Sequence, residues 1–395
     1  MFDRLTPDAP DAILALMQAF RDDPRADKID LGVGVFRDAT GQTPVMAAVR
    51  AAEARLAATQ STKTYTSFTG TPEFGQAMAR LVLDGAVAGD RLAVAATTGG
   101  TGALRMAFDL VRGLAPHATV WLPEQGWPNH AAILRHLGMP MRSYAHAAPD
   151  GTLAFDRMMA DLGQAAAGDV VVLHGCCHNP TGIDPDLAQW AAIAALCAAR
   201  GLLPLVDLAY LGFGDGIAAD AAGLRHLART CPETLVAVSA SKSFGVYRDR
   251  VGALIAIASG PAPARALRDR LATLNRMVCS FPPDHGARVV QTVLDDPALH
   301  ADWAAELDAM RRRIADLRHA LAAALAAATA PDPGITAIAR QRGMFSRLPL
   351  SPDRMDRLRS DHAVYATRDG RINIAGLTDA TVPLLAARIG AVTRA

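Results

Sequence analysis

Several features that mark particular classes of protein are missing from this sequence. The formal net charge is only +1, with 40 basic and 39 acidic residues, so the chain offers no field that would attract nucleic acid or an anionic membrane. The longest apolar run, residues 187–206, is interrupted by Arg200, Gly201 and Pro204 and is too short to cross a bilayer. The opening MFDRLTPDAP lacks the basic and apolar regions of a signal peptide. These absences predict a cytoplasmic protein that acts on small molecules.

Cysteine is also scarce. The five cysteines are odd in number and follow no framework spacing, which fits a reducing compartment. Two of them adjoin histidines in HGCCHNPTG, residues 174–182, where a zinc site must be considered. Zinc ligands are usually spaced so that each side chain turns toward one ion, whereas an extended segment would point Cys176 and Cys177 to opposite faces. No metal is therefore expected, the cysteines are interpreted as packing residues, and His178 is given no role.

What the sequence has in quantity is an alternation of apolar strands and helices. Hydrophobic residues make up 51% and charged residues 20% of the 395 residues, which is ordinary for a globular protein. The expected strands are Ala118–Leu122, Asp169–His174, Leu202–Leu208, Leu235–Ser239 and Val251–Ala258, and the expected helices include Thr101–Leu114, Pro185–Ala199 and Ala219–Arg229. Near-continuous Val, Leu and Ile in the strands predicts an α/β protein with helices on both faces of a mostly parallel sheet.

The pattern changes near residue 297. A long helical run rich in Ala and Arg extends to Ala330 and leads into a tail that contains GMFSRL and RINIAGL. We expect residues 31–300 to form a large α/β domain. Residues 1–30 and 301–395 are expected to form a smaller α+β domain from both termini, with a helix at Asp11–Arg21.

The ends of the predicted strands carry the polar groups, and ligands of open α/β sheets bind beyond the carboxyl ends of the strands. TTGGTGALR, residues 97–105, is a glycine turn that runs into a helix, so backbone N–H groups and the positive helix end face outward as an anion site. A tight turn without a ligand would explain this segment equally well. Neither G-x-x-x-x-G-K-[ST] nor G-x-G-x-x-G occurs in the sequence, which disfavours a nucleotide triphosphatase or a dinucleotide-binding protein.

Three further strand ends carry groups of other kinds. Asp207 lies inside an apolar strand and therefore needs a cation or hydrogen-bond donors. Lys242 stands among serines in SASKSFG, with Arg250 eight residues later; alone, this lysine could be a surface charge. Asn179 in HNPTG adds an amide. An amine, a carboxylate, an amide and an anion pocket are the groups that pyridoxal phosphate (PLP) requires.

Five motifs occur in order along the chain: GGTGALR, HNPTG, D-x-A-Y, S-x-S-K followed by an arginine eight residues on, and RINIAG. Together they resemble the fold-type-I, class I aminotransferases of the aspartate and aromatic branch, and the likeness extends from LGVGVFRD to RINIAGL. The resemblance implies the PLP-dependent transferase fold type I, with a mostly parallel seven-stranded sheet, helices on both faces and a smaller α+β domain. It also implies pyridoxal 5′-phosphate as the cofactor.

The resemblance assigns roles to residues at matched positions. Lys242 is expected to hold the cofactor covalently and to move the proton, Asp207 to pair with the pyridine nitrogen, and Tyr210 to complete the catalytic set. The other residues expected to bind the cofactor are Tyr65, Gly100, Thr101, Trp127, His130, Asn179, Ser239, Ser241 and Arg250. His130 is expected to support Asp207 from behind, and His174 is a candidate to extend the same network.

Substrate contacts are expected from Gly34, Trp127, Asn179, Arg371 and Arg276. Arg371 matches the arginine that clamps the substrate α-carboxylate in a bidentate pair. In this family Tyr65 and Arg276 belong to the neighbouring subunit's site, where Tyr65 reaches the phosphate and Arg276 the distal carboxylate of the substrate. The resemblance therefore implies a homodimer with shared active sites.

The implied reaction moves an amino group from an aromatic amino acid or aspartate to 2-oxoglutarate by a ping-pong, PLP-dependent mechanism. Arg276 favours dicarboxylates, but several nearby positions depart from the aspartate-specific pattern. These are Phe36, Leu211, Cys279 and Phe281, where Tyr, Gln, Tyr and Asn are usual. LNRMVCSFPP looks closer to bacterial aromatic amino acid aminotransferases. The alternatives are an aspartate aminotransferase with little aromatic activity and a PLP lyase or decarboxylase.

Overall fold

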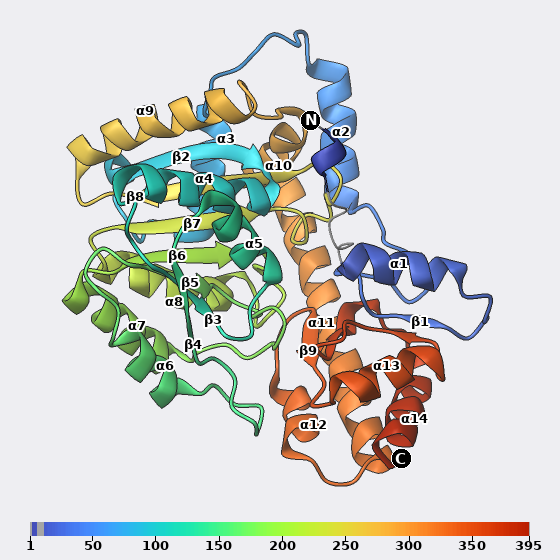
Figure 1. Cartoon of the computed structure of the whole chain (residues 1–395). Helices are drawn as coiled ribbons and strands as arrows, with labels where there is room; N and C mark the ends of the chain where they lie inside the picture. Colours follow the sequence, from blue (N-terminus) through green and yellow to red (C-terminus); the bar gives the residue numbers. More distant parts are fainter. Residues whose placement is uncertain (1, 6–11, 395) are drawn as a thin grey trace.

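A seven-stranded sheet forms the centre of the computed structural model, which describes residues 2–5 and 12–394 (Figure 1). The strands lie in the order β2-β8-β7-β6-β5-β3-β4. Their bounds are β2 Leu92–Thr98, β3 Val120–Pro123, β4 Met141–Tyr144, β5 Val170–His174, β6 Leu203–Leu208, β7 Thr234–Ser239 and β8 Val251–Ile257. Among these seven strands only β8 runs antiparallel to its neighbours. The predicted α/β class and mostly parallel sheet are confirmed.

Alternate residues of the central strands face two different layers of helices. In β5, Val170 and Val172 pack into the core beneath α4, α5 and α9, whereas Val171 and Leu173 pack into the core on the side of α3, α7, α8 and α10. The helices around the sheet are α3 Pro72–Leu83, α4 Gly99–Leu114, α5 Pro128–Leu137, α6 Phe155–Leu162, α7 Leu187–Arg200, α8 Ile217–Thr230, α9 Pro261–Val278 and α10 His285–Asp295. Because both faces are covered, the strands are apolar throughout rather than alternating.

Local sequence signals decide where these helices begin and end. α7 starts with a capping box, in which the Asp186 carboxylate accepts the Gln189 N–H at 2.8 Å and the Gln189 side-chain oxygen accepts the Asp186 N–H at 2.9 Å. The helix ends at Gly201, whose φ of 64° is the left-handed conformation that glycine adopts without strain. At the start of α4, Gly99 has a φ of 70°, which lets the chain turn directly from β2 into the helix.

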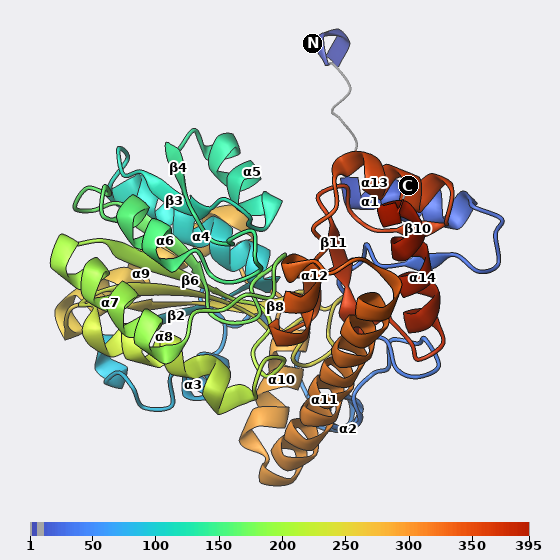
Figure 2. The ribbon, with the colours of Figure 1, turned by 90° about the horizontal axis from the view of Figure 1, so that it is seen from below.

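A second group of elements, drawn from both ends of the chain, lies beside the sheet (Figure 2). It contains two small sheets: β1 (Ile29–Asp30) pairs parallel with β10 (Val364–Tyr365), and β9 (Phe345–Arg347) pairs antiparallel with β11 (Arg371–Asn373). The helices of the chain not yet named are α1 Ala12–Asp22, α2 Ala47–Thr59, α11 Pro297–Ala328, α12 Pro333–Ala337, α13 Pro352–Ser360 and α14 Thr381–Arg394. Short 3-10 turns lie along the chain at Phe2–Arg4, Gly89–Arg91, Ile338–Arg340 and Ile374–Gly376. The division into domains at residues 31 and 300 stays a prediction.

The predicted strands and helices agree with the observed ones to within two residues at each end. The helix predicted at Asp11–Arg21 corresponds to α1, although Asp11 itself lies outside the described residues. Two strands of the central sheet, β2 and β4, are absent from the predicted strands. β4 is an edge strand in which Met141, Arg142 and Ser143 are exposed. Within residues 2–5 and 12–394, no helix has the length and apolar character needed to span a membrane. The cytoplasmic location stays a prediction.

Gly252 of β8 passes very close to the turn that starts α4. A Cβ atom on Gly252 would lie 2.5 Å from the carbonyl carbon of Gly99 and 2.7 Å from the carbonyl oxygens of Gly99 and Val238. Gly252→Ala is therefore expected to lower the free energy of unfolding by roughly 1–3 kcal/mol, because backbone rather than a flexible side chain has to move. Chemical unfolding measures this. Gly89→Ala, where no atom lies within 4 Å of the new Cβ, is the control; equal losses would contradict the close approach.

Candidate active site

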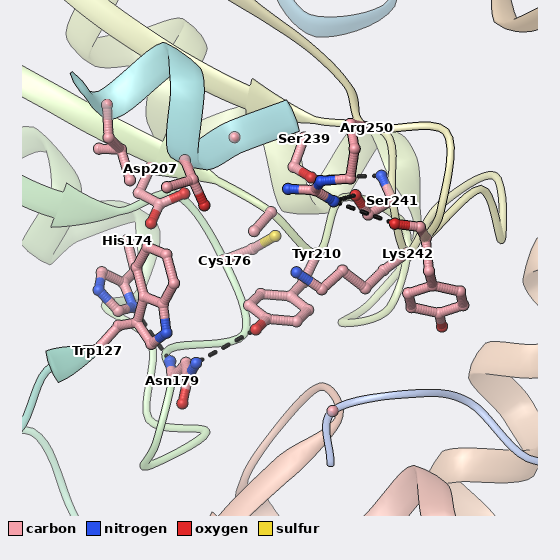
Figure 3. A pocket seen from close by; sticks show the side chains of 16 residues that line it. Trp127, His174, Cys176, Asn179, Asp207, Tyr210, Ser239, Ser241, Lys242 and Arg250 are labelled. Atoms are coloured by element: carbon pink, nitrogen blue, oxygen red, sulfur yellow. Dashed lines mark hydrogen bonds between the residues drawn. The ribbon is translucent and has the colours of Figure 1, made fainter. Parts of the chain in front are cut away.

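A cavity of about 210 Å³ opens at the carboxyl ends of the parallel strands. Its lining comes from the segments after β2, β5, β6 and β7, as expected for an open α/β sheet. The lining residues are Gly34, Gly100, Thr101, Leu104, Trp127, His174, Cys176, Asn179, Asp207, Ala209, Tyr210, Ser239, Ser241, Lys242, Tyr247 and Arg250. Figure 3 shows Asp207 and Arg250 toward opposite ends, with Lys242 and Tyr210 between them. The structure thus brings together all the predicted cofactor-binding residues except Tyr65 and His130.

One end of the cavity is built to hold an anion. The first turn of α4, which carries Gly100 and Thr101, points its backbone N–H groups into this end. Gly100 packs so closely on Ser239 that a Cβ on the glycine would lie 2.9 Å from the serine Cβ. Arg250 donates to the Ser241 hydroxyl at 3.3 Å. Helix end, hydroxyl groups and guanidinium therefore converge on one small space, which suits a phosphate.

The other end holds the buried carboxylate of Asp207. His130, from α5 and 1% exposed, places Nε2 3.0 Å from Asp207 Oδ2. Burial alone would raise the pKa of Asp207, but the hydrogen bond with His130 lowers it below its usual value. Asp207 is therefore an ionised group at neutral pH. His130 lies behind it rather than in the cavity wall.

Lys242 carries the amine of the site. Burial lowers the pKa of its ammonium group, Arg250 and Arg371 lower it further, and Asp207 opposes them. A lowered pKa increases the share of the neutral amine, which is the form that acts as nucleophile and base. The Lys242 Nζ atom lies 4.9 Å from the centre of the Tyr210 ring. Burial also raises the pKa of Tyr210, so its hydroxyl keeps its proton.

Asn179 and Tyr210 form a hydrogen-bonded pair on the wall of the cavity. Asn179 Nδ2 donates to the Tyr210 hydroxyl at 3.3 Å (Figure 3). Among the described residues Asn179 Oδ1 is buried and has no hydrogen-bond partner, so it can still accept a bond from a ligand. The turn after it depends on Gly182, because a Cβ there would lie 2.8 Å from the Phe345 carbonyl oxygen.

Arg371 of β11 lies beside a second hollow that shares Trp127 and Asn179 with the main cavity. One of its terminal nitrogens donates to the Gly32 carbonyl oxygen at 2.8 Å, and its guanidinium lies 4.7 Å from the Phe345 ring centre. Arg371 is 6% exposed, and its Nε has no hydrogen-bond partner among the described residues. A buried guanidinium with an unused donor is suited to a carboxylate ligand.

Two predicted residues lie away from the cavity. Tyr65 is 79% exposed and stacks on Phe281 with ring centres 4.5 Å apart. The exposed Arg276 places its guanidinium 4.8 Å from the ring centre of Phe68. Neither residue lines the cavity within one chain, so a role at this cavity requires a second chain.

The interpretation of the paired cysteines needs a correction. The segment after β5 is not extended, because Cys177 adopts a φ of 52°. As a result, both cysteine Sγ atoms and the carboxylate of Asp220 lie within 4.8 Å of one another instead of on opposite faces. Both cysteines are buried, as packing residues should be, and Cys176 also lines the cavity. The expectation of no metal stays a prediction.

Sequence reasoning missed two aromatic residues of the site. Tyr247 lines the cavity, and its hydroxyl accepts the backbone N–H of Phe36 at 3.1 Å. Phe345 lies next to both Arg371 and Tyr210, with its ring 5.9 Å from the Tyr210 ring. Tyr247 stands between Lys242 and Arg250 in the sequence, which is a signal that could have been used. Phe345 belongs to GMFSRL, a segment whose place at the site only the fold reveals.

Known proteins match this chain along nearly its whole length. Residues 26–389 match the family model described as aminotransferase class I and II. The chain is 49% identical to the aromatic-amino-acid aminotransferase of Paracoccus denitrificans, over 98% of this chain and 99% of that protein. It is 42% identical to the aspartate aminotransferase of Escherichia coli strain K12, over 97% and 98%. The structure of an aromatic-amino-acid aminotransferase from Burkholderia pseudomallei, covalently bound to pyridoxal phosphate, matches with a TM-score of 0.96 at 37% identity, covering 100% of this chain and 99% of that one.

The fold and the cavity define a PLP-dependent enzyme of fold type I. The chain belongs to the class I and II aminotransferases, which confirms the resemblance seen in the sequence. Its cofactor is pyridoxal 5′-phosphate, and the residues present fit this group. The cavity offers an anion cradle at Gly100, an ionised carboxylate at Asp207, an amine at Lys242 and an unsatisfied buried amide oxygen at Asn179.

A substitution of Arg250 tests whether this end of the cavity binds the phosphate. Arg250→Gln is expected to weaken the binding of pyridoxal phosphate by roughly 10- to 150-fold, because a charge-assisted hydrogen bond contributes about 1.5–3 kcal/mol. Equilibrium titration of the cofactor-free protein by absorbance gives the dissociation constant. Arg248→Gln, at an exposed arginine of the same turn, is the control. Pyridoxal, which has no phosphate, should lose little affinity in Arg250→Gln; an equal loss for both ligands would refute the assignment.

Proposed function

We propose that this enzyme transfers the amino group of aromatic amino acids or aspartate to 2-oxoglutarate in a ping-pong reaction. The observation that carries the proposal is the placing of one amine of lowered pKa, Lys242, between an ionised carboxylate, Asp207, and an anion pocket at Gly100 and Arg250. This set can hold a phosphorylated pyridine ring by both ends while a base acts at its centre. The names of the relatives support the donor classes.

The proposal gives each cavity residue a task toward the cofactor. Backbone N–H groups of Gly100 and Thr101, together with Ser239, Ser241 and Arg250, hold the phosphate. Asp207 pairs with the pyridine nitrogen, supported by His130, while Asn179 and Tyr210 face the phenolic oxygen. Trp127 covers the ring and Lys242 binds it covalently. When bound, the cofactor supplies an electron sink that makes the substrate Cα–H acidic.

Lys242 is proposed as the base of the reaction. With the cofactor bound and Lys242 free, the neutral Lys242 amine would accept the proton from the substrate Cα and become an ammonium group. The lowered pKa of Lys242 favours this task, because a base works best when its pKa is near the working pH. Asp207 keeps its charge throughout, so the nitrogen that it faces stays protonated. Tyr210 orients the site through its contact with Asn179.

Arg371 is proposed to bind the substrate α-carboxylate. Its free Nε and its position beside Trp127 and Asn179 support a bidentate pair with that carboxylate. The Phe345 ring beneath the guanidinium limits its movement. Gly34 leaves room there, because a Cβ on it would lie 2.6 Å from the Phe345 ring.

We also propose a homodimer in which Tyr65 and Arg276 complete the site of the partner subunit. Tyr65 is 79% exposed, and Met277 and Val278 beside Arg276 are 67% and 64% exposed. Large apolar and aromatic side chains that are exposed together favour a protein interface. In this arrangement Tyr65 would reach the phosphate and Arg276 the distal carboxylate of a dicarboxylic substrate. Arg276 lies over the Phe68 ring, and Phe68 packs on Phe281. These aromatic rings support a site that also accepts rings.

The two arginines are expected to separate the substrates. Arg276→Leu should lower kcat/KM for aspartate by roughly 10- to 150-fold, because one charge-assisted contact is lost. It should leave phenylalanine and tyrosine nearly unchanged, because their rings offer Arg276 no anion. Arg371→Leu should lower kcat/KM for all three alike. Initial rates with 2-oxoglutarate measure this, and Arg265→Leu, at another exposed arginine of α9, is the control.

Two results would change the proposal in different ways. If the native enzyme aminates 2-oxoglutarate from aspartate but not from phenylalanine or tyrosine, it is an aspartate aminotransferase and the aromatic proposal is wrong. If Arg276→Leu affects aspartate and tyrosine equally, Arg276 does not bind the distal carboxylate.

The shared site is tested with two inactive chains. Lys242→Ala removes the base and Arg276→Asp removes the distal contact, so neither homodimer should act on aspartate. Randomly mixed chains should recover about a quarter of the native activity, because half of the dimers are hybrids with one intact site. Co-expression with two different tags allows the hybrid to be purified, and the pure hybrid should show about half of the native activity, because one of its two sites is intact. Recovery no greater than in either parent would argue against sites shared between subunits.

A further inference from the structure

Four buried histidines form a continuous row that begins at Asp207. His130 contacts the Asp207 carboxylate at 3.0 Å, and the His130 and His174 rings meet edge to face with centres 5.4 Å apart. His174 stacks on His178 at 4.1 Å, and His178 stacks on His146 at 3.5 Å, with interplanar angles of 23° and 15°. None of the four is more than 8% exposed. We call His174, His178 and His146 the histidine stack.

The hydrogen bonds of His174 fix where its proton lies. The backbone N–H of Asn179 donates to His174 Nδ1 at 3.1 Å. A nitrogen that accepts an N–H cannot carry a proton of its own, so His174 is the neutral ring with its proton on Nε2. To become a cation, His174 would have to break this contact, which also holds the backbone of Asn179 at the cavity wall.

The other two rings are held at one nitrogen each. His146 Nε2 donates to the carbonyl oxygen of Ile183 at 3.0 Å. Thr181 accepts the backbone N–H of Ile183 at 3.2 Å, and its hydroxyl lies 2.9 Å from His178 Nδ1. His178 Nε2 has no partner among the described residues, so no acceptor compensates a second proton on that ring.

The surroundings also oppose a charge on any ring of the stack. Burial lowers the pKa of His174 to about 3 and that of His146 to about 4, and the neighbouring histidines add to the effect on His174. Burial likewise puts the pKa of His178 well below its usual value. Two cations could not coexist in rings stacked at 3.5 and 4.1 Å without strong repulsion.

We propose that the histidine stack is a positioning device that keeps His174 uncharged, so that Asp207 keeps its full negative charge for the cofactor's ring nitrogen. His174 stands directly opposite Asp207 in the pairing of β5 with β6. A cationic His174 would share the carboxylate and weaken its hold on that nitrogen. His178 and His146 act through His174 by filling the space behind it with apolar ring faces, which excludes water. The proposal rests on the proposed function, which places the ring nitrogen against Asp207.

The ionisable groups around the stack come from several elements. His130 and Asp207 lie at one end, and Lys242 acts on Asp207 across the cavity. Near the other end, the Asp184 carboxylate accepts the backbone N–H of His178 at 2.8 Å, and Arg342 acts on Asp184. Burial raises the pKa of Asp184 to about 6, so this group titrates in the acid range by itself. A test must therefore report on the histidine rings directly.

The test uses the holoenzyme labelled with 13C in its histidine rings, titrated by NMR without substrate. The signals of His146, His174 and His178, assigned by single substitutions, should not move between about pH 5.5 and 8.5. The signal of the exposed His136 is the control. In His146→Ala, water enters the end of the stack and His174 should begin to titrate in this range. His146→Phe keeps a flat ring against His178, so the His174 signal should not shift with pH in this variant.

The pH profile of kcat/KM supplies the second readout. Protonated His174 would weaken the pairing of Asp207 with the cofactor's ring nitrogen, so His146→Ala should lose activity as pH falls. The acid limb of its kcat/KM profile should move up by about one pH unit, which makes kcat/KM about tenfold lower at the acid end. His146→Phe and the surface variant His136→Ala should keep the native acid limb. The proposal is overturned if His174 titrates normally in the native enzyme, or if His146→Ala and His146→Phe behave alike in both readouts. An enzyme without aminotransferase activity would refute the proposed function, while the NMR result would still decide the state of His174.

Discussion

The arrangement of the site depends on one ionised carboxylate held inside an apolar sheet. Asp207 is 9% exposed in β6, between strands whose side chains are buried. Removing a carboxylate from water costs several kcal/mol unless hydrogen bonds or opposite charges compensate it. His130 supplies the hydrogen bond from α5, and Lys242 supplies positive charge from the segment after β7. In the proposed function, the position of these three side chains fixes where a protonated ring nitrogen and a reacting carbon can lie.

Parallel strands explain how these groups meet. β5, β6 and β7 run in the same direction, so the residues that follow them reach the same edge of the sheet. Asn179, Asp207 and Lys242 therefore face one cavity although they are far apart in the chain. The helix end at Gly100 reaches this edge as well, because β2 also points toward it.

The second group of elements contributes Arg371 to the site by a different route. Arg371 lies on the short strand β11, which pairs with β9 and thereby brings the Phe345 ring beneath the guanidinium. Buried Arg318 of α11 holds this region by donating to Ser346 and to the Gly343 carbonyl oxygen. Arg318 has no carboxylate partner among the described residues and instead anchors backbone carbonyl groups. Burial lowers its pKa to about 10. The position of Arg371 relative to Lys242 follows from the packing of this second group of elements against the elements around the central sheet.

Much of this protein can be predicted from its sequence, and the reasons are local. Apolar runs between glycine and proline fixed the strands to within two residues, and ordered motifs indicated which strand ends carry the amine, the carboxylate and the anion turn. The two edge strands β2 and β4 were not among the predicted strands. The residues of β4 lack the apolar run that marks buried strands.

Only the tertiary structure decided three other features. Phe345 reached the site through the pairing of β9 with β11, which no local signal encodes. The two cysteines came together because Cys177 adopts a positive φ, a backbone choice set by its surroundings. His146 joined His178 and His174 because a loop after β4 packs against the turn after β5. The sequence determined which groups are available and on which element each lies. Packing between elements determined which groups touch, because contact energy depends on distances that a linear pattern does not contain.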